Sequence, residues 1–393
     1  MMIEAVVVAY GRSAVGKAPK GTFKDTRPEV IGATVIKSVL QMVPQLDPAE
    51  IDDVILGCAF QEAEQGTNIA RRILLQAGMP KSVPAQTVNR FCSSGLQSIA
   101  MGANAIIAGQ AKVIMAGGVE TMSMIPMGGN MNTPEAGFSD VSPEGMVAMG
   151  ITAENVAALY GISREEQDAF ALESHRRAEA AQDAGLFDDI IPVDAIKYKT
   201  NADGTVVSYT VPFVKDEGIR RGLTLEALAK LKPVFKKNGS VTAGNASQMN
   251  DAASVVILME KSRAEELGIK PIAKFVSFAV AGCEPEYMGI GPIHAIPKAL
   301  QIAGLTKNDI DLWELNEAFA AQALACIKEL GLNSDIVNVN GGGIALGHPL
   351  GCTGAVLTCK LLAELKRRNG KYGVVSMCIG GGMGAAGVYE MCN

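Results

Sequence analysis

Residues 85–118 read AQTVNRFCSSGLQSIAMGANAIIAGQAKVIMAGG, a pattern typical of an α/β protein. A short strand is expected over Ala85–Val88 and a helix over Ser94–Ala108, where apolar side chains recur at helical spacing. A buried strand follows at Val113–Ala116 and ends in two glycines. Strands that alternate with helices in this way pair in parallel, so helices are expected on both faces of a sheet.

The same alternation extends toward the N-terminus and returns in the last third of the chain. Val6–Ala9 and Val54–Gly57 are predicted buried strands, each followed by a helical pattern. The predicted counterparts in the last third are Ile310–Leu315 for Ile51–Leu56, Val337–Asn340 for Gln86–Asn89, and Val374–Met377 for Val113–Met115. Two similar α/β halves are therefore expected, with chance similarity between α/β units as the alternative.

The middle of the chain interrupts this alternation. Met122–Pro143 has little periodicity, Ser163 begins a polar helix that runs to about Ala184, and Lys197–Val211 is typical of an exposed hairpin. A long insertion can cover a site at the strand ends, or it can serve only oligomer contacts. The predicted organisation is an N-terminal half of residues 1–120 plus 250–270, an inserted loop domain of residues 121–249 and a C-terminal half of residues 271–393.

Composition and charge exclude several classes of protein. The 393 residues are 48% hydrophobic and 19% charged, as in a globular chain with a sizeable core. The formal net charge is −6, so nothing favours nucleic acid or an anionic membrane surface as a partner. Eight cysteines without a Cys-x-x-Cys pair, with only three histidines, argue against a zinc site or a disulfide framework and favour a reducing cytoplasm. No apolar run predicts membrane insertion, and the N-terminus is typical of a strand rather than a signal peptide.

Cys92 lies where the strand of the opening stretch leads into its helix. The partial positive charge and free N–H groups at a helix N-terminus favour a thiolate, so a nucleophile would be expected at such a position. A small buried cysteine that only packs at the helix start is the alternative.

Three segments of the last third offer further chemistry. His348 stands within Gly341–Gly351, where a neutral imidazole could take a proton from a thiol or help to bind an oxyanion, unless it is a structural histidine. Cys378 ends an apolar run and opens into a glycine tract, so its thiol could act as acid or base beside bare N–H groups. Asn316 follows a predicted strand and could hold a water molecule, cap a helix, or do both.

Together these segments resemble the thiolase family. The matching motifs lie in the family's order across both halves, at Asn89–Gly95, Asn316–Ala320, Gly347–Gly351 and Cys378–Gly384. One motif alone would be weak, whereas four separated motifs over the whole chain are specific. The resemblance implies an α/β fold of two similar halves with a duplicated βαβαβαββ order in five layers and an inserted loop domain.

The resemblance also implies roles for the motif residues. Cys92 would be the nucleophile that is acylated, and His348 would activate it and, with a water held by Asn316, stabilise the thioester oxygen as an enolate. Cys378 would exchange the proton at the α-carbon of acetyl-CoA. The backbone N–H groups of Cys92 and Gly380 would form the oxyanion hole of the acyl-enzyme step.

Coenzyme A is long and anionic, and the resemblance places most of its contacts in the insertion. Arg220 matches a position near the nucleotide end, and Ser247 matches one near the pantetheine arm. Phe235 and Phe319 would line that channel, and Met288 would line the acyl end. No metal or nicotinamide cofactor is implied, because coenzyme A and acyl-CoA are substrates.

One departure from the family pattern bears on substrate length. Short-chain members that act on acetoacetyl thioesters usually carry a histidine just before the Met-Gly that precedes Thr-Ala-Glu-Asn, and Ala148 occupies that place here. Together with the motifs around Cys92 and His348, this resembles the degradative branch, which accepts longer 3-ketoacyl chains.

The predicted activity is that of a 3-ketoacyl-CoA thiolase, which uses coenzyme A to cleave 3-ketoacyl-CoA to acetyl-CoA and a shortened acyl-CoA in fatty-acid β-oxidation. The alternatives are an acetyl-CoA acetyltransferase that makes or splits acetoacetyl-CoA and, in a different class, a thiolase-like acyl-CoA-binding protein without turnover. Cys378 argues against condensing enzymes that act on carrier proteins, because those usually combine one cysteine with two histidines or with His and Asn. The resemblance further implies a homodimer or homotetramer in the cytoplasm, with a β-oxidation multienzyme partner as a further expectation.

Overall fold

The computed structural model describes residues 3–130, 134–135 and 137–392, and one large mixed sheet runs through both halves of the chain. Its main strands lie in the order β4-β3-β5-β9-β1-β10-β13-β12-β11. The strands of the first half are β1 (Ala5–Ser13), β3 (Asp53–Gly57), β4 (Ala85–Val88), β5 (Val113–Thr121) and β9 (Asn250–Glu260). Those of the second half are β10 (Ala273–Gly282), β11 (Leu312–Leu315), β12 (Tyr372–Ile379) and β13 (Met383–Met391). The short strands β2 (Gly16–Lys17) and β6 (Ile190–Ile191) pair with β9 and β1.

The pairing directions agree with the opening stretch of sequence. β3 lies between β4 and β5 and pairs in parallel with both, as expected for a strand–helix–strand unit, and β11 pairs in parallel with β12. The other contacts between these main strands are antiparallel. The two halves join where β1 pairs with β10 at Val6 and Val7.

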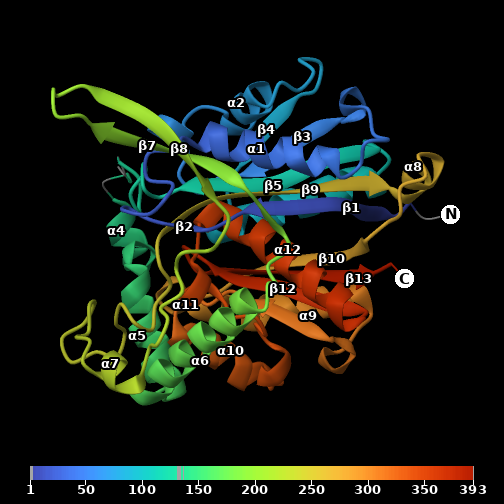
Figure 1. Ribbon diagram of the computed structural model, residues 1–393. Coiled ribbons are helices and arrows are strands. Elements are labelled where there is room, and N and C mark those ends of the chain that lie inside the picture. The colour runs from blue at the N-terminus through green and yellow to red at the C-terminus, as the bar shows by residue number, and fades with distance from the viewer. Residues whose placement is uncertain (1–2, 131–133, 136, 393) are drawn as a thin grey trace.

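Six helices pack on the outer faces of the two halves of the sheet and between those halves. Three helix layers and two sheet layers result, which confirms the predicted fold class (Figure 1). They are α1 (Pro28–Gln41), α2 (Ile69–Gln76), α3 (Ser94–Ile107), α9 (Gly291–Ala303), α10 (Ala320–Leu330) and α12 (Leu350–Arg368). α1 and α2 cover the outer face of the first half, and α9 and α10 cover that of the second. α3 and α12 lie between the halves, in a core cluster to which strands of both halves contribute.

One predicted strand is wrong. Val337–Asn340 forms no strand, and only Val337 makes an isolated parallel bridge, to Trp313. Asn338 has a φ of +48°, and its side-chain amide bonds both backbone groups of Leu315, accepting from N at 2.9 Å and donating to O at 2.7 Å. A side chain therefore does here what a strand backbone would do at the edge of the sheet.

The insertion contains the helix and the hairpin that the sequence predicts. α6 (Arg164–Asp183) begins with a capping box between Ser163 and Glu166. β7 (Val193–Thr200) and β8 (Val206–Phe213) form a two-stranded hairpin that projects from the body (Figure 1). The insertion also contains α4 (Phe138–Val141), α5 (Met149–Tyr160) and α7 (Leu225–Ala229). Two further short helices, α8 (Lys261–Glu266) and α11 (Gly343–Leu346), lie outside it. Of the irregular stretch 122–143, residues 131–133 and 136 lie outside the described residues.

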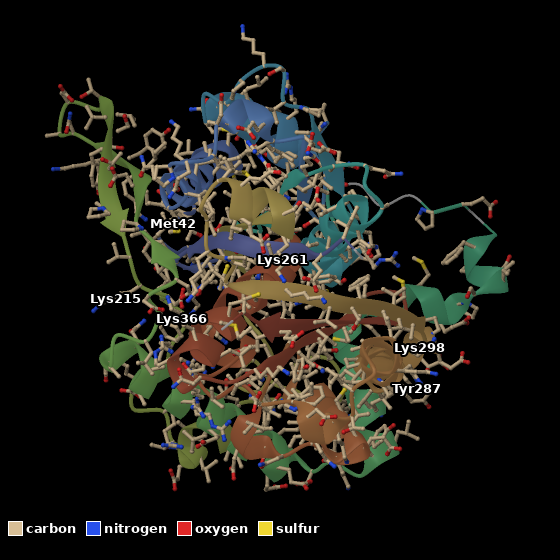
Figure 2. The ribbon with its side chains drawn as sticks, turned by 90° about the vertical axis from the view of Figure 1, so that its right-hand side faces the viewer. Met42, Lys215, Lys261, Tyr287, Lys298 and Lys366 are labelled. Atoms are coloured by element: carbon tan, nitrogen blue, oxygen red, sulfur yellow. The ribbon has the colours of Figure 1, made fainter. Side chains whose placement is uncertain are left out.

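Figure 2 shows Lys261 and Lys298 apart from each other and from Lys215 and Lys366, so these four side chains do not form one basic patch. Within the ranges that the structure describes, no helix combines the length and apolar character that crossing a bilayer requires.

The first turns of α3 and α12 touch backbone to backbone. A Cβ atom at Gly354 would stand 2.3 Å from the backbone N of Leu96, and one at Gly95 would stand 2.9 Å from the N of Ala355. Neither contact leaves room for a side chain. The residues that precede the two helices, which include Cys92 and His348, are brought together by this crossing.

We predict that Gly354→Ala weakens the fold, because the new methyl group would meet the backbone of α3 rather than a flexible side chain. Overpacking of this kind typically costs about 1–3 kcal/mol of the free energy of unfolding, which urea or thermal unfolding would measure. Gly137→Ala is a matched control, since its nearest atom is a carboxylate oxygen of Glu135 at 3.1 Å. Equal stability of both variants would contradict the close contact.

Candidate active site

Cys92 lies in a tight turn between β4 and α3. Phe91–Ser93 form one turn of 3₁₀ helix, and the backbone of Phe91 has a φ of +43°, a value that residues other than glycine rarely adopt. Two polar side chains hold the turn: Asn89 Oδ1 accepts from the Phe91 N–H at 2.8 Å, and Ser94 Oγ donates to the Phe91 carbonyl at 2.7 Å. These contacts fix the Cys92 thiol at the entrance of the helix.

The environment of Cys92 does not favour the thiolate as the sequence predicted. Burial raises the pKa of the thiol to about 11, and the charge of Glu120 adds to the increase. The N–H groups of Gly380 and of Cys92 itself donate to the sulfur and oppose that increase only in part. The prediction of a thiolate stabilised at the helix start is therefore wrong for the protein alone, and the thiol needs a base. The two N–H groups are the pair that the resemblance assigns to the oxyanion hole.

His348 is held both at its backbone and at its ring. Its N–H donates to Asn250 Oδ1 at 2.9 Å, and Asn250 in turn donates to the carbonyl of Gly16 at 2.9 Å. Gly347 has a φ of +113°, and a Cβ there would stand 2.4 Å from Asn250 Cγ, so only glycine fits. The ring Nδ1 lies 2.6 Å from Thr353 Oγ1. Burial lowers the pKa of His348 to about 4, so the imidazole is neutral at physiological pH.

Asn316 follows β11 and lies against the imidazole. Its Nδ2 is 3.4 Å from each ring nitrogen of His348, and its Oδ1 is buried without a hydrogen-bond partner among the described residues. An acceptor in that state is suited to a water molecule or a ligand. The expectation that Asn316 also caps a helix is wrong, because α10 begins at Ala320 with Phe319 in the cap position.

Cys378 lies one residue before the end of β12 and is fully buried. It packs in a small apolar cluster with Met288, Ala318 and Phe319. Burial raises the pKa of its thiol well above the ordinary value, and the neighbouring Cys92 thiol adds to the increase. Both thiols are therefore protonated in the resting site, and any thiolate must be formed by proton transfer.

One cavity of about 380 Å³ brings most of the predicted residues together. Cys92, His348 and Cys378 all line it, and so do Phe235, Ser247, Met288 and Phe319. Three predicted residues lie outside the lining: Gly380, whose N–H donates to the Cys92 sulfur, and Asn316 and Arg220. Asn316 contacts the ring of the lining residue His348. Arg220 is half-buried and donates to the carbonyl of the lining residue Ala243 at 3.1 Å.

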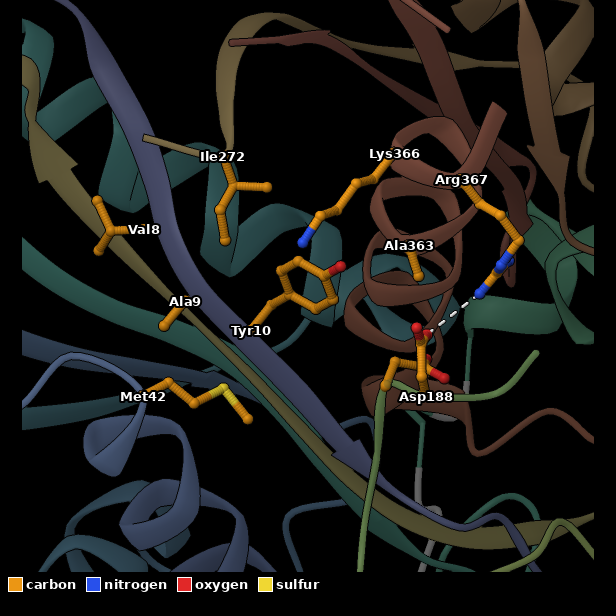
Figure 3. A pocket seen from close by; sticks show the side chains of 10 residues that line it. Val8, Ala9, Tyr10, Met42, Asp188, Ile272, Ala363, Lys366 and Arg367 are labelled. Carbon is orange, nitrogen blue, oxygen red and sulfur yellow. Dashed lines mark hydrogen bonds and ion pairs between the residues drawn. The ribbon is translucent and has the colours of Figure 1, made fainter. Parts of the chain in front are cut away.

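A larger cavity of about 560 Å³ lies elsewhere and contains none of the predicted site residues (Figure 3). β1, the end of α1 and the end of α12 border it, and its polar lining includes Tyr10, Lys366 and the pair Arg367–Asp188 at 3.2 Å. Within the part of the chain that the structure describes, no cluster of three or more His, Cys, Asp or Glu side chains could hold a metal ion. The apolar cavity with the two thiols is thus the candidate active site.

Sequence reasoning missed three residues that build the site. Thr353 and Asn250 hold His348, as described above. Glu120 is fully buried at the end of β5, where it accepts from the N–H groups of Ala59 and Gly351, each at 2.8 Å. An acidic residue that ends an otherwise apolar strand was a usable signal for Glu120, whereas nothing in the sequence distinguishes the contact of Thr353.

We predict that alkylation of Cys92 by iodoacetamide accelerates with pH and does not level off between about pH 6 and about pH 9, because only the thiolate reacts. With the pKa at about 11, the thiolate fraction should rise roughly tenfold per pH unit over that range. Peptide mass mapping would follow the modified residue, with Cys92→Ser as the control. A plateau near neutral pH would contradict the dominance of burial.

Comparisons with known proteins agree with this geometry. The family model described as thiolase, N-terminal domain, matches residues 5–262, and that described as thiolase, C-terminal domain, matches residues 269–391. A 3-ketoacyl-CoA thiolase of Bacillus subtilis (strain 168) is 52% identical over 392 residues, which is 100% of both chains. The peroxisomal 3-ketoacyl-CoA thiolase of Homo sapiens is 48% identical over 389 residues, 98% of this chain and 90% of the relative.

A solved structure gives the same result in three dimensions. The crystal structure of the Bacillus anthracis acetyl-CoA acetyltransferase superposes with a TM-score of 0.89 at 42% sequence identity, covering 100% of this chain and 99% of the other. Both halves of the chain, the folded arrangement and the two-thiol cavity thus lead to one conclusion: the chain belongs to the thiolase family.

Proposed function

We propose that this protein is a 3-ketoacyl-CoA thiolase that cleaves 3-ketoacyl-CoA with coenzyme A in fatty-acid β-oxidation. The observation that carries the proposal is one apolar cavity lined by two buried thiols and a neutral imidazole. This cleavage requires a nucleophile, a base for it and a second acid, and Cys92, His348 and Cys378 supply that set. The relatives named 3-ketoacyl-CoA thiolase support the same assignment.

In the first half-reaction, His348 takes the proton of the Cys92 thiol, and the thiolate attacks the ketone carbon of the substrate. The bond between the α- and β-carbons then breaks, which leaves the shortened acyl group on Cys92 as a thioester. The departing enolate of acetyl-CoA is stabilised by the His348 imidazolium and by a water held by Asn316. Cys378 gives its proton to the enolate carbon, and acetyl-CoA leaves.

In the second half-reaction, the Cys378 thiolate takes the proton of the coenzyme A thiol. The resulting thiolate attacks the acyl-Cys92 thioester, and the N–H groups of Cys92 and Gly380 bind the oxygen of the tetrahedral intermediate. The Cys92 sulfur then leaves and recovers its proton from His348. Both thiols return to their starting state, so the cycle needs no metal or redox cofactor.

The lining of the cavity supports an apolar acyl chain as substrate. Beyond the catalytic residues it is largely apolar, with Met127, Met149, Met249, Met288 and Leu350 among its side chains. Ala148 also lines it, so the position at which short-chain relatives usually place a histidine holds only a methyl group. The alternative, an acetyl-CoA acetyltransferase, is favoured by the name of the Bacillus anthracis structure.

We also propose how the chain is organised around this activity. Phe235 and Ser247 line the cavity, which supports a role in coenzyme A binding for the insertion of residues 121–249. The half-buried guanidinium of Arg220 would meet the nucleotide end of coenzyme A, since burial already lowers the pKa of this group and a phosphate would offset the cost. A homodimer or homotetramer in the cytoplasm, and a β-oxidation multienzyme partner, stay predictions.

We predict that Cys92→Ser abolishes measurable cleavage and that Cys378→Ser slows it by about 10²–10⁴-fold, the usual contribution of a general acid–base group. Wild-type protein incubated with a 3-ketoacyl-CoA should carry, on Cys92, the acyl chain without its acetyl unit, as peptide mass mapping would show. Cys359→Ser, a buried thiol of α12 outside the cavity, should keep activity. Undiminished cleavage by either active-site variant would refute the proposed roles.

We predict activity across 3-ketoacyl-CoA substrates of about four to about sixteen carbons, because an apolar pocket gains binding energy with each methylene. Ala148→His should reduce kcat/KM for the longest chains by about tenfold or more while leaving the shortest substrate nearly unchanged. Ala148→Ser, which adds little volume, is the control. Wild-type activity confined to the shortest substrate would instead identify an acetyl-CoA acetyltransferase.

A further inference from the structure

The His348 ring has one short hydrogen bond in the structure, to Thr353. The hydroxyl Oγ1 stands 2.6 Å from Nδ1, and Thr353 is only 1% exposed. Thr353 lies in the first turn of α12, and its N–H donates to the carbonyl of Pro349 at 3.1 Å. The hydroxyl and the imidazole are thus held by the same turn of chain.

Asn316 cannot distinguish the two ring nitrogens, because its Nδ2 is 3.4 Å from both. Thr353 contacts only Nδ1, and its hydroxyl favours the Nδ1–H tautomer when it accepts and the Nε2–H tautomer when it donates. A neutral imidazole carries one proton, and the nitrogen without it is the base. If the hydroxyl accepts the Nδ1–H, the lone pair is on Nε2, the nitrogen remote from Thr353.

We propose that Thr353 is a positioning residue that keeps His348 in the Nδ1–H tautomer, so that Nε2 can take the proton of Cys92. The inference rests on the proposed function and assigns to Thr353 a task that the motif residues leave unassigned. After the transfer, the imidazolium still donates from Nδ1 to Thr353 Oγ1, and Nε2–H is free to bind the enolate oxygen. One acceptor at Nδ1 therefore serves both steps that His348 performs.

A hydroxyl is suited to this task in a way that a carboxylate is not. A carboxylate at Nδ1 would favour the charged imidazolium and raise the pKa of His348, whereas a neutral hydroxyl orients the ring without adding charge. The observed environment is of the second kind, because burial lowers that pKa to about 4. The ring therefore stays a neutral base that is charged only while it holds the Cys92 proton.

The position of Thr353 is fixed from both sides of α12. Glu120 accepts from the Gly351 N–H at 2.8 Å, which anchors the start of the helix to the first half. Gly354, the next residue, packs directly on the backbone of α3. Such a rigid setting is what a group that selects a tautomer requires, because a small displacement would lengthen the bond to Nδ1.

The test compares Thr353→Val, which keeps the shape and removes the hydroxyl, with Thr353→Ser, which keeps the hydroxyl. Thr353→Val should lower kcat by about 10- to 100-fold, less than the full contribution of general-base catalysis, and leave KM within about twofold. Thr353→Ser should restore most of kcat. Thr358→Val is the matched control: it removes another buried hydroxyl of α12, one that contacts Gly354 and Tyr389 outside the cavity, and kcat should be retained.

Alkylation of Cys92 by iodoacetamide checks that the site stays intact in these variants. At about pH 8, Thr353→Val and His348→Ala should both react at about the wild-type rate, because burial of the thiol rather than the neutral base sets the thiolate fraction. In turnover, the double variant should lose little kcat beyond His348→Ala, since the hydroxyl acts through the ring. A hydroxyl that only stabilises the fold would instead lower kcat further in the double variant.

Two outcomes would overturn the inference. One is a Thr353→Val protein with wild-type kcat, and the other is a Thr353→Ser protein as impaired as Thr353→Val. Failure of the proposed function would look different, because wild-type protein would then neither cleave a 3-ketoacyl-CoA nor carry an acyl group on Cys92.

Discussion

The active site depends on the contact between the first turns of α3 and α12. Gly95 and Gly354 remove the side chains that would separate the two backbones, so the loops that lead into the helices must meet. Cys92 enters the site from the first of these loops and His348 from the second. Glu120 adds a polar connection at the same place, because it bonds Ala59 of the first half and Gly351 of the second.

Burial dominates the electrostatics of this site. It raises the pKa of both thiols and lowers that of His348, so all three groups are neutral at rest. Such a site stores no separated charges, and the reactive thiolate exists only while a proton has moved to a neighbouring group. The lining around these groups is largely apolar, which suits the acyl chain of the thioester.

Much of this could be predicted from the sequence, because the signals were local. Strand and helix periodicity gave the two similar halves, and the motifs around Cys92, His348 and Cys378 gave the residues that line the cavity. The misplaced strand at Val337–Asn340 shows the limit of such reasoning, since the Asn338 side chain replaces backbone pairing and leaves no trace in apolar periodicity.

Long-range contacts could not be predicted in the same way. The pKa of Cys92 depends on how deeply the folded chain buries the thiol, which a helix N-terminus in the sequence does not reveal. Asn250 is likewise far from His348 in the sequence, although it bonds the backbone of that residue. The fold brings such partners together through a sheet order in which neighbours in space are distant along the chain.

The duplicated order of strands and helices has a further consequence for the chemistry. Cys92 precedes the first residue of α3 by the same interval at which His348 precedes the first residue of α12, and the two helices hold equivalent places in the two repeats. Nucleophile and base thus each stand two residues before a helix that lies between the halves, so the contact of α3 with α12 sets the position of both groups at once.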